Sequence, residues 1–356
     1  MSLPNIGRGR RGRTAFFSIL GFGMAALCTG IVHSQQPAPT PDKDAVREHV
    51  LKARALADGE LIRFFNRRCL VEPAYRTTIA QSNQAPAPMD PVKVMDNLYF
   101  LGQNGVSSWA LQTSEGFVVF DTLNNPDEAK KYIEGGMVKL GLDPAKIKYI
   151  VVTHEHGDHF GGAVYLKEKF GAHIMASKIA WDAMARTAAA PPRQAASDAP
   201  ARSGAPPDWA KLVPPHDMDI TDGQKFAVGD ATLTFYLTPG HAAGVVSTIF
   251  RATDHGVAHV VGLHGGLGSI NDPANRVTHV EQLKRWRSIA QAAGVDTLVG
   301  NHQTQDGAVE NLELVKIRQG DDPNPFTLGK EGYLRYVDIN IECTYANMAR
   351  SGQKIQ

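Results

Sequence analysis

Four side chains that can bind a metal ion fall within a run of six residues: His154, His156, Asp158 and His159. Imidazole and carboxylate ligands together suit zinc and its neighbours. His154 and His156 are two residues apart, so both can face one ion, and Asp158 and His159 can serve a second ion close by. The backbone is expected to turn sharply around the ions because glycine occupies three positions here: Gly157, Gly161 and Gly162. The run predicts a site for one or two zinc ions.

The elements around this run place it at the edge of a sheet. Residues 147–153 are apolar, rich in β-branched side chains and end abruptly in polar residues, which predicts a strand. His241 lies in a Thr-Pro-Gly-His turn after a predicted strand at 231–237, and His302 follows another at 297–300. Because α/β folds place ligands at the carboxyl ends of strands, we expect all three segments to converge on one site.

The remaining patterns indicate an α/β architecture. Apolar spacing predicts helices at 42–70, 128–140, 163–170 and 280–293. Further strands are predicted at 92–101, 106–113, 117–121, 172–176, 245–251 and 258–262. Residues 188–215 are low in complexity and are expected to form a surface loop, and the tail from residue 310 is expected to be helical in parts.

The His-x-His-x-Asp-His run, the Thr-Pro-Gly-His turn and the late histidine together resemble the metallo-β-lactamase-fold hydrolases over residues 92–305. The resemblance implies a four-layer αββα sandwich, here with an N-terminal helical extension within 35–91 and a C-terminal one at 306–356. Carried over by motif, the first metal site takes His154, His156 and His241. The second takes Asp158, His159 and His302.

One departure from the family concerns the segment 260–266. Many family hydrolases, including glyoxalase II-like and lactonase-like enzymes, carry a bridging Asp after an apolar strand, but this segment has no acid and His264 stands near that place. A pair of ions without a bridging carboxylate resembles the true β-lactamases, especially the third subclass. His264 itself could be an extra ligand, a neighbour of the ligands, a substrate contact or a structural residue.

The resemblance implies a zinc-dependent hydrolase acting on a small molecule. Zinc lowers the pKa of bound water, and the resulting hydroxide would attack a carbonyl carbon, with Asp158 orienting it or accepting its proton. Three hypotheses stay open: a hydrolase of a cyclic amide such as a β-lactam, a hydrolase of another ester, lactone or thioester, and a non-catalytic metal-binding module on the same fold.

The N-terminal segment predicts export. The chain has 356 residues and a net charge of +1, but residues 1–34 hold four Arg and no other charged residue, followed by a diluted apolar stretch. This layout is typical of a cleaved secretory signal, with a retained membrane anchor as the alternative. We therefore expect a periplasmic or secreted protein without a stable anchor. Its net charge of −3 has the wrong sign for a nucleic-acid binder, and its oligomeric state is not predicted.

The cysteines bear on the predicted export. If Cys28 leaves with the signal, Cys69 and Cys343 remain near opposite ends of the mature chain. An oxidising compartment would let them form a disulfide that ties the two extensions together. The alternative is two unpaired cysteines.

Overall fold

The computed structural model describes residues 40–75, 88–190, 207–268, 270 and 272–355. All of them belong to one compact unit, Pro39–Gln356. The predicted signal at 1–34, Cys28, residues 35–39, where we also expect the start of a linker at 35–41, and the middle of the predicted 188–215 loop lie outside the described residues. Within the described part of the chain, no helix is both long and apolar enough to span a membrane.

Two sheets form the centre of the unit. In the first, seven strands lie side by side in chain order: β1 (Val92–Met95), β2 (Leu98–Phe100), β3 (Trp109–Thr113), β4 (Gly116–Phe120), β5 (Ile147–Val151), β6 (His173–Ser177) and β7 (Met218–Ile220). The first four strands are antiparallel, and β4 to β7 are parallel. The parallel half brings the carboxyl ends of β4 and β5 to the same edge.

The second sheet runs in the order β12-β11-β10-β9-β8. Its strands are β8 (Lys225–Val228), β9 (Ala231–Leu237), β10 (Val246–Asp254), β11 (Val257–His264) and β12 (Thr297–Gly300). All neighbours are antiparallel except β11 and β12, which are parallel.

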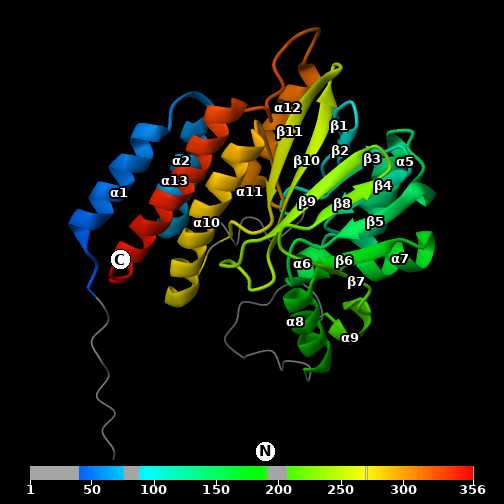
Figure 1. Cartoon of the computed structure of the whole chain (residues 1–356), viewed down its shortest axis with the longest axis horizontal. Coiled ribbons are helices and arrows are strands. Elements are labelled where there is room, and N and C mark those ends of the chain that lie inside the picture. The colour runs from blue at the N-terminus through cyan, green and yellow to red at the C-terminus, as the bar shows by residue number, and fades with distance from the viewer. Residues whose placement is uncertain (1–39, 76–87, 191–206, 269, 271, 356) are drawn as a thin grey trace, which may run out of the picture. The chain divides into compact units, whose positions relative to one another are not determined.

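Helices cover the outer face of each sheet (Figure 1). Against the first sheet pack α4 (Pro126–Glu128), the π-helical turn η3 (Ala129–Glu134), α5 (Gly135–Lys139), α7 (Ala163–Phe170) and α8 (Lys178–Ala189). Against the second pack α1 (Lys43–Leu56), η1 (Gly59–Leu61), α2 (Ile62–Phe65), the π-helical turn η2 (Asn66–Val71), α10 (Pro273–Ala293) and α13 (Gly329–Arg350). Shorter helices lie in the connections: η4 (Pro144–Lys146), α6 (Gly157–Phe160), α9 (Trp209–Leu212), α11 (Gln303–Asp306) and α12 (Ala308–Ile317). The predicted αββα sandwich with helical extensions is confirmed.

An apolar core fills the space between the sheets and holds them in register. Phe120 of β4 stacks on Phe250 of β10 with ring centroids 5.2 Å apart, and Trp109 and Phe235 are buried in the same core. Each such side chain contributes about 1.5–3 kcal/mol by burial. Two further cores lie under the helical layers.

Local signals explain where the long helices begin and end. Asp272 caps α10 by accepting a hydrogen bond from the Ala274 amide (2.7 Å), Pro273 takes the first position, and Gly294 ends the helix with φ of 71°. Asp42 caps α1 in the same way.

Several elements differ from expectation. The predicted helix at 42–70 breaks after Leu56, where Ala57 takes an extended backbone and Gly59 then adopts a left-handed φ of 47°. The predicted strand at 92–101 is a hairpin in which Met95 pairs with Leu98. Strands β7 and β8 were not predicted, and the described ends of the 188–215 segment include the end of α8 and all of α9. The tail is helical on both sides of Pro323 and Pro325, as predicted.

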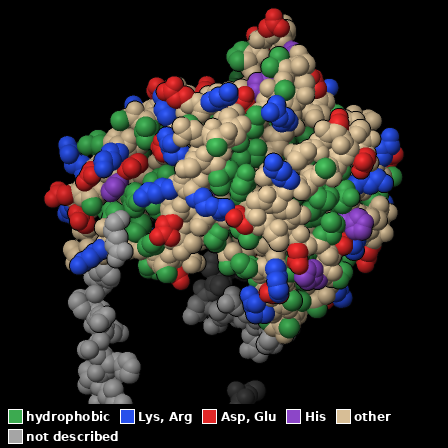
Figure 2. Space-filling view, viewed as in Figure 1, with side chains coloured by type: hydrophobic (Ala, Val, Ile, Leu, Met, Phe, Trp, Pro, Cys, Tyr) green, Lys and Arg blue, Asp and Glu red, His purple; other side chains and the backbone are tan. Residues whose placement is uncertain are grey.

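The extensions join into one helical layer. Helix α1 packs along α13, and between them His49 is 9% exposed and lies 2.6 Å from the Glu342 carboxylate. The outer face of this layer carries basic and acidic side chains together (Figure 2).

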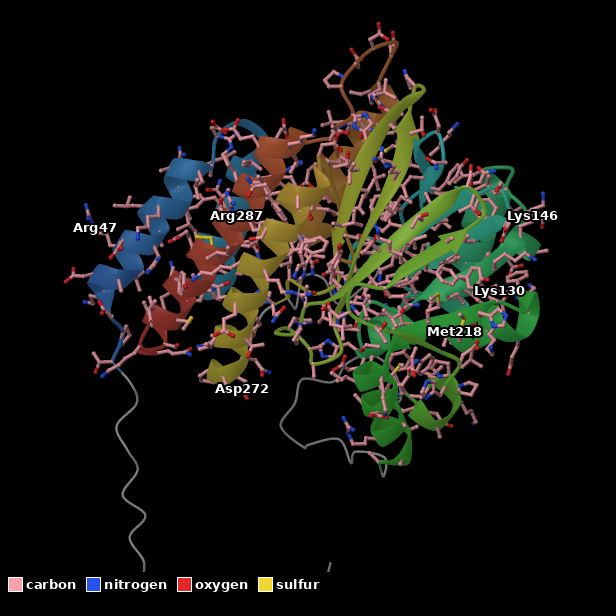
Figure 3. All side chains as sticks on the ribbon, viewed as in Figure 1. Arg47, Lys130, Lys146, Met218, Asp272 and Arg287 are labelled. Atoms are coloured by element: carbon pink, nitrogen blue, oxygen red, sulfur yellow. A yellow bond between two sulfur atoms is a disulfide. The ribbon has the colours of Figure 1, made fainter. Side chains whose placement is uncertain are left out.

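The predicted disulfide is confirmed: Cys69 of η2 is bonded to Cys343 of α13 (Figure 3). It joins residues 274 positions apart, so it ties the N-terminal extension to the C-terminal helix. A cross-link that closes so long a segment restricts the unfolded chain strongly.

We predict that the double variant Cys69→Ser/Cys343→Ser folds but loses about 2–5 kcal/mol of unfolding free energy, because its unfolded chain is less restricted. Urea unfolding of both proteins measures the difference, and thiol titration of the chain from residue 35 should find free thiols only after reduction. Equal stabilities, or free thiols before reduction, would contradict the bond.

Candidate metal centre

Three strand ends and one short helix position the predicted ligands. His154 and His156 follow β5, and His156 has an extended backbone (φ −79°, ψ 145°) that begins α6. Helix α6 carries Asp158 and His159. His241 follows β9 and His302 follows β12, so the structure brings all six predicted ligands to one edge of the sandwich.

The first ligand trio consists of His154, His156 and His241, whose ligand atoms lie within 4.8 Å of one another. His154 Nε2 and His156 Nδ1 are 3.1 Å apart. Two nitrogen ligands at about 2.0–2.1 Å from one tetrahedral zinc would be separated by roughly this distance. His154 is buried, His241 half-buried and His156 exposed, so the trio opens to solvent on one side.

The second ligand trio consists of Asp158, His159 and His302. Asp158 Oδ2 lies 3.5 Å from His159 Nε2 and 3.6 Å from His302 Nε2. The ring centroids of His154 and His159 are 4.0 Å apart, so the two trios are neighbours. They share no residue, and no carboxylate among the described residues belongs to both.

Hydrogen bonds fix which nitrogen each imidazole turns toward its trio. His154 Nδ1 donates to the Gly265 carbonyl (2.8 Å), His302 Nδ1 donates to the Gly105 carbonyl (2.8 Å), and His159 Nδ1 donates to Asp121 Oδ2 (2.7 Å). Since carbonyls and carboxylates accept, these Nδ1 atoms carry the protons and each Nε2 keeps its lone pair. A hydrogen bond from the ring nitrogen that does not face the metal orients a metal-binding histidine in this way.

Asp121, at the end of β4, is the main functional residue that the sequence did not reveal. Its side chain is fully buried and accepts from the Thr153 amide and hydroxyl (2.8 Å each) as well as from His159. Its backbone is left-handed, with φ of 59°. The available signal was an acid ending the apolar run 117–121.

The electrostatics of the trios favour neutral imidazoles in the first and a cation in the second. Burial lowers the pKa of His154 well below its usual value and that of His241 to about 3. Burial also acts to lower the pKa of His159, but the Asp158 and Asp121 carboxylates outweigh it and raise that pKa to about 9. Neutral imidazole is the form that binds metal, and a position flanked by two carboxylates suits a metal cation.

The donor set therefore fits zinc. Buried His159 Nε2 and His241 Nδ1 have no hydrogen-bond partner, although unpartnered buried nitrogens are costly. A zinc ion held by each trio would give both nitrogen atoms a partner. Zinc in proteins takes nitrogen and carboxylate ligands of this kind.

The turn that carries His241 is braced from two sides. Glu155, between the two histidines of the run, accepts from the Ala243 and Gly244 amides (3.0 Å each). On the other side, a Cβ atom at Gly240 would lie 2.6 Å from that of His279, so glycine is needed there. The Thr-Pro-Gly-His pattern thus reflects packing against α10.

The glycines of the motif act differently from the prediction. None of the three at 157, 161 and 162 has a positive φ. They allow close approach instead: a Cβ atom at Gly161 would lie 2.1 Å from the Asn124 carbonyl oxygen, and one at Gly157 would lie 2.1 Å from the Trp209 ring.

His264 lies apart from both trios. It ends β11 with 2% of its surface exposed, and its ring faces His279 and Trp286 at centroid distances of 6.1 and 5.8 Å. Its neighbour Gly265 contributes to the site instead, through the carbonyl that orients His154. This placement favours the structural role among the alternatives for His264.

A cavity of about 800 Å³ opens beside His156 and Asp158. Its other walls combine amide side chains with an aromatic and an aliphatic side chain, from Asn124, Asn125, Trp209 and Leu212. A cavity of this size and mixed lining suits a small organic molecule.

Comparison with known proteins agrees with this geometry. The family model of the metallo-beta-lactamase superfamily matches residues 101–260. Residues 101–260 are therefore similar to the metallo-beta-lactamase superfamily domain.

Solved structures place the fold within the superfamily. The subclass B3 metallo-beta-lactamase BJP-1 of Bradyrhizobium japonicum is 25% identical with a TM-score of 0.55, covering 72% of this chain and 92% of its own. The FEZ-1 metallo-beta-lactamase of Legionella gormanii is 20% identical with a TM-score of 0.56, covering 71% and 93%. The latter shows the fold alone. The predicted likeness to the third subclass is confirmed.

Two curated proteins that are similar to this chain are hydroxyacylglutathione hydrolases, not β-lactamases. The hydroxyacylglutathione hydrolase of Cereibacter sphaeroides is 24% identical over 204 residues, which is 56% of this chain and 66% of that protein. That of Rhizobium etli is 30% identical over 99 residues, 28% of this chain and 27% of its own. The chain thus matches less than two thirds of these relatives.

We predict that Asp121→Asn lowers the affinity of the second trio for zinc about 10- to 100-fold, because the amide cannot hold His159 as the carboxylate does. Asparagine suits the left-handed backbone, so the fold should persist. Zinc titration with a competing chelator measures the affinity.

The matched control is Asp127→Asn, which removes an exposed carboxylate from the nearby helix α4. Its zinc affinity should equal that of the unmodified protein. Equal zinc affinities for Asp121→Asn and the control would show that Asp121 does not support the trio.

Proposed function

We propose that this protein is an exported, zinc-dependent hydrolase that opens a cyclic amide, with a β-lactam as the candidate substrate. The observation that carries the proposal is the pair of ligand trios, three histidines in one and Asp-His-His in the other, with no carboxylate shared between them. This is the arrangement that the sequence resemblance associates with the third metallo-β-lactamase subclass.

The proposed reaction needs residues that hold the metal ions and a residue that positions the attacking water. When bound, zinc supplies Lewis acidity and lowers the pKa of water. His154, His156 and His241 would hold one ion through three neutral nitrogens, and exposed His156 turns this trio toward the solvent. Asp158, which belongs to the second trio and lines the cavity, would orient the attacking water or hold its proton.

The cavity offers a compact substrate both apolar and polar lining residues. Trp209 and Leu212 provide apolar surface, while Asn124 and Asn125 can donate or accept hydrogen bonds at the polar end. A carbonyl group would be brought near His156 and Asp158, which line the same cavity. The substrate class is thus a small molecule with an apolar body and a polar carbonyl.

A thioester hydrolase is the second candidate. It is favoured by the curated relatives named hydroxyacylglutathione hydrolase. The absence of an acid at 260–266 counts against it, because hydrolases of that type are expected to carry a bridging Asp there.

Export is supported by two features. Residues 1–34 carry four Arg before an apolar stretch, which is the layout of a secretory signal. The Cys69–Cys343 disulfide suits an oxidising compartment, which supports the proposed location in the periplasm or outside the cell.

We predict that the purified mature protein hydrolyses a carbapenem and a cephalosporin, and that His156→Ala lowers kcat/KM by at least about 1,000-fold, because the first trio loses a ligand. The matched control His173→Ala changes an exposed histidine on β6 and should retain full activity. Initial rates across a panel of β-lactams, lactones and thioesters decide between the candidates.

Turnover of lactones or thioesters without any β-lactam turnover would contradict the cyclic-amide assignment. No turnover of any substrate by zinc-loaded protein would favour the non-catalytic module instead.

We predict two zinc ions per chain, falling to one in His302→Ala, because that variant leaves the first trio intact. Elemental analysis after dialysis against zinc-buffered solution measures the ratio. Two ions retained by the variant would exclude His302 as a ligand.

A further inference from the structure

A second pocket lies on the helical layer, between η2, α13 and the start of α10. Its volume is about 280 Å³. It is lined by polar side chains from both extensions, which include Arg68, Asn340, Thr344, Asn347, Arg350 and Ser351. None of these residues lines the cavity beside the ligand trios.

The charge of this lining is strongly positive. Three guanidinium groups line the pocket, those of Arg68, Arg276 and Arg350, and the only carboxylate among the described lining residues is Glu72. Glu72 offsets one of these charges, because its Oε2 lies 3.0 Å from Arg68 Nη1, and the lining keeps a net positive charge. Groups of like charge gathered in a partly enclosed space raise the local potential and attract anions.

Besides the Glu72 carboxylate at Arg68, neutral side chains hold these guanidinium groups in place. Arg350 Nη1 donates to Asn347 Oδ1 and Arg276 Nη1 donates to Ser351 Oγ (2.7 Å each). Arg68 Nε donates to Asn340 Oδ1 (3.1 Å). The donors are therefore oriented before any ligand binds, which reduces the entropy lost on binding.

Arg350 contributes a guanidinium group from the last turn of α13. No ion pair joins it to a carboxylate of the described residues. Burial acts to lower the pKa of Arg350 from its usual value. A half-buried guanidinium in this state is stabilised by an anionic partner.

The positive charge of Arg68 also acts on two buried histidines near the pocket. Arg68 adds to burial in lowering the pKa of His264 and of His279, and His279 lines the pocket. Both imidazoles are therefore held neutral and add no positive charge of their own.

We propose that this pocket binds a small multivalent oxyanion, which carries either phosphate or two carboxylates. Guanidinium groups donate in a planar fork that matches the paired oxygens of such groups. Asn347 adds a side-chain amide to the lining, and its nitrogen is a neutral donor beside Arg350. The Asn340, Thr344 and Ser351 side chains donate to backbone carbonyls and shape the wall.

The pocket and the first trio are separated by a thin wall. Gly268 lines the pocket, and a Cβ atom there would lie 2.4 Å from His241 Cε1. Since an oxyanion could also bind at a zinc ion, the test must distinguish the two positions.

The experiment is isothermal titration calorimetry of the zinc-loaded mature protein, with inorganic phosphate in one arm and succinate in the other. We expect at least one of them to bind, and Arg350→Gln to weaken that binding at least about tenfold. The control Arg47→Gln removes an exposed arginine of α1 (Figure 3) and should change the affinity less than about twofold. Tighter binding of phosphate identifies the ligand group as a phosphate, and tighter binding of succinate identifies it as a dicarboxylate.

His156→Ala separates the two positions, because it disrupts the first trio and leaves the pocket intact. Binding that survives His156→Ala and weakens in Arg350→Gln supports the pocket. Binding that is lost in His156→Ala and unchanged in Arg350→Gln, or no binding in either arm, overturns it. If Arg350→Gln does not fold, Arg350→Lys, which keeps the charge but loses the fork, should still weaken binding, and unchanged affinity would overturn the proposal.

Discussion

The buried carboxylate of Asp121 is the contact on which the candidate metal centre depends. It joins the end of β4 to the end of β5 through the Thr153 amide and hydroxyl, and it orients His159 through Nδ1. A buried carboxylate is costly unless hydrogen bonds satisfy it, and these three bonds do so. The left-handed backbone at Asp121 is strained for a non-glycine residue and lies, as such strain often does, beside a functional site.

The two sheets contribute different parts to this centre. The first sheet supplies a compact run after β5, while the second supplies single histidines after β9 and β12. Asn301 connects the halves, since its Nδ2 donates to the Thr153 hydroxyl (2.9 Å) and the Gly265 carbonyl (2.8 Å). Asp306 then accepts from the Gly300 amide (2.7 Å) and fixes the turn that carries His302. The trios are therefore held by hydrogen bonds that cross between sheets.

The sequence predicted what depends on local pattern. The six ligands could be recognised because a run of ligand types follows an apolar strand, and because His241 and His302 also follow strands. The residues that orient them could not, since Asp121 and Gly105 reach their histidines from distant segments, 38 and 197 positions away. The short strands β7 and β8 were missed for a related reason: their stability comes from pairing with β6 and β9, which a single segment does not display. The joining of the two extensions into one layer was anticipated only through the cysteines.

The central claim is that two zinc ions occupy two separate trios without a shared carboxylate. Anomalous diffraction at the zinc absorption edge, from crystals of the mature protein grown with zinc, tests it directly. The account predicts two peaks, one coordinated by His154, His156 and His241 and the other by Asp158, His159 and His302. A single peak, or a peak coordinated by His264, would contradict it.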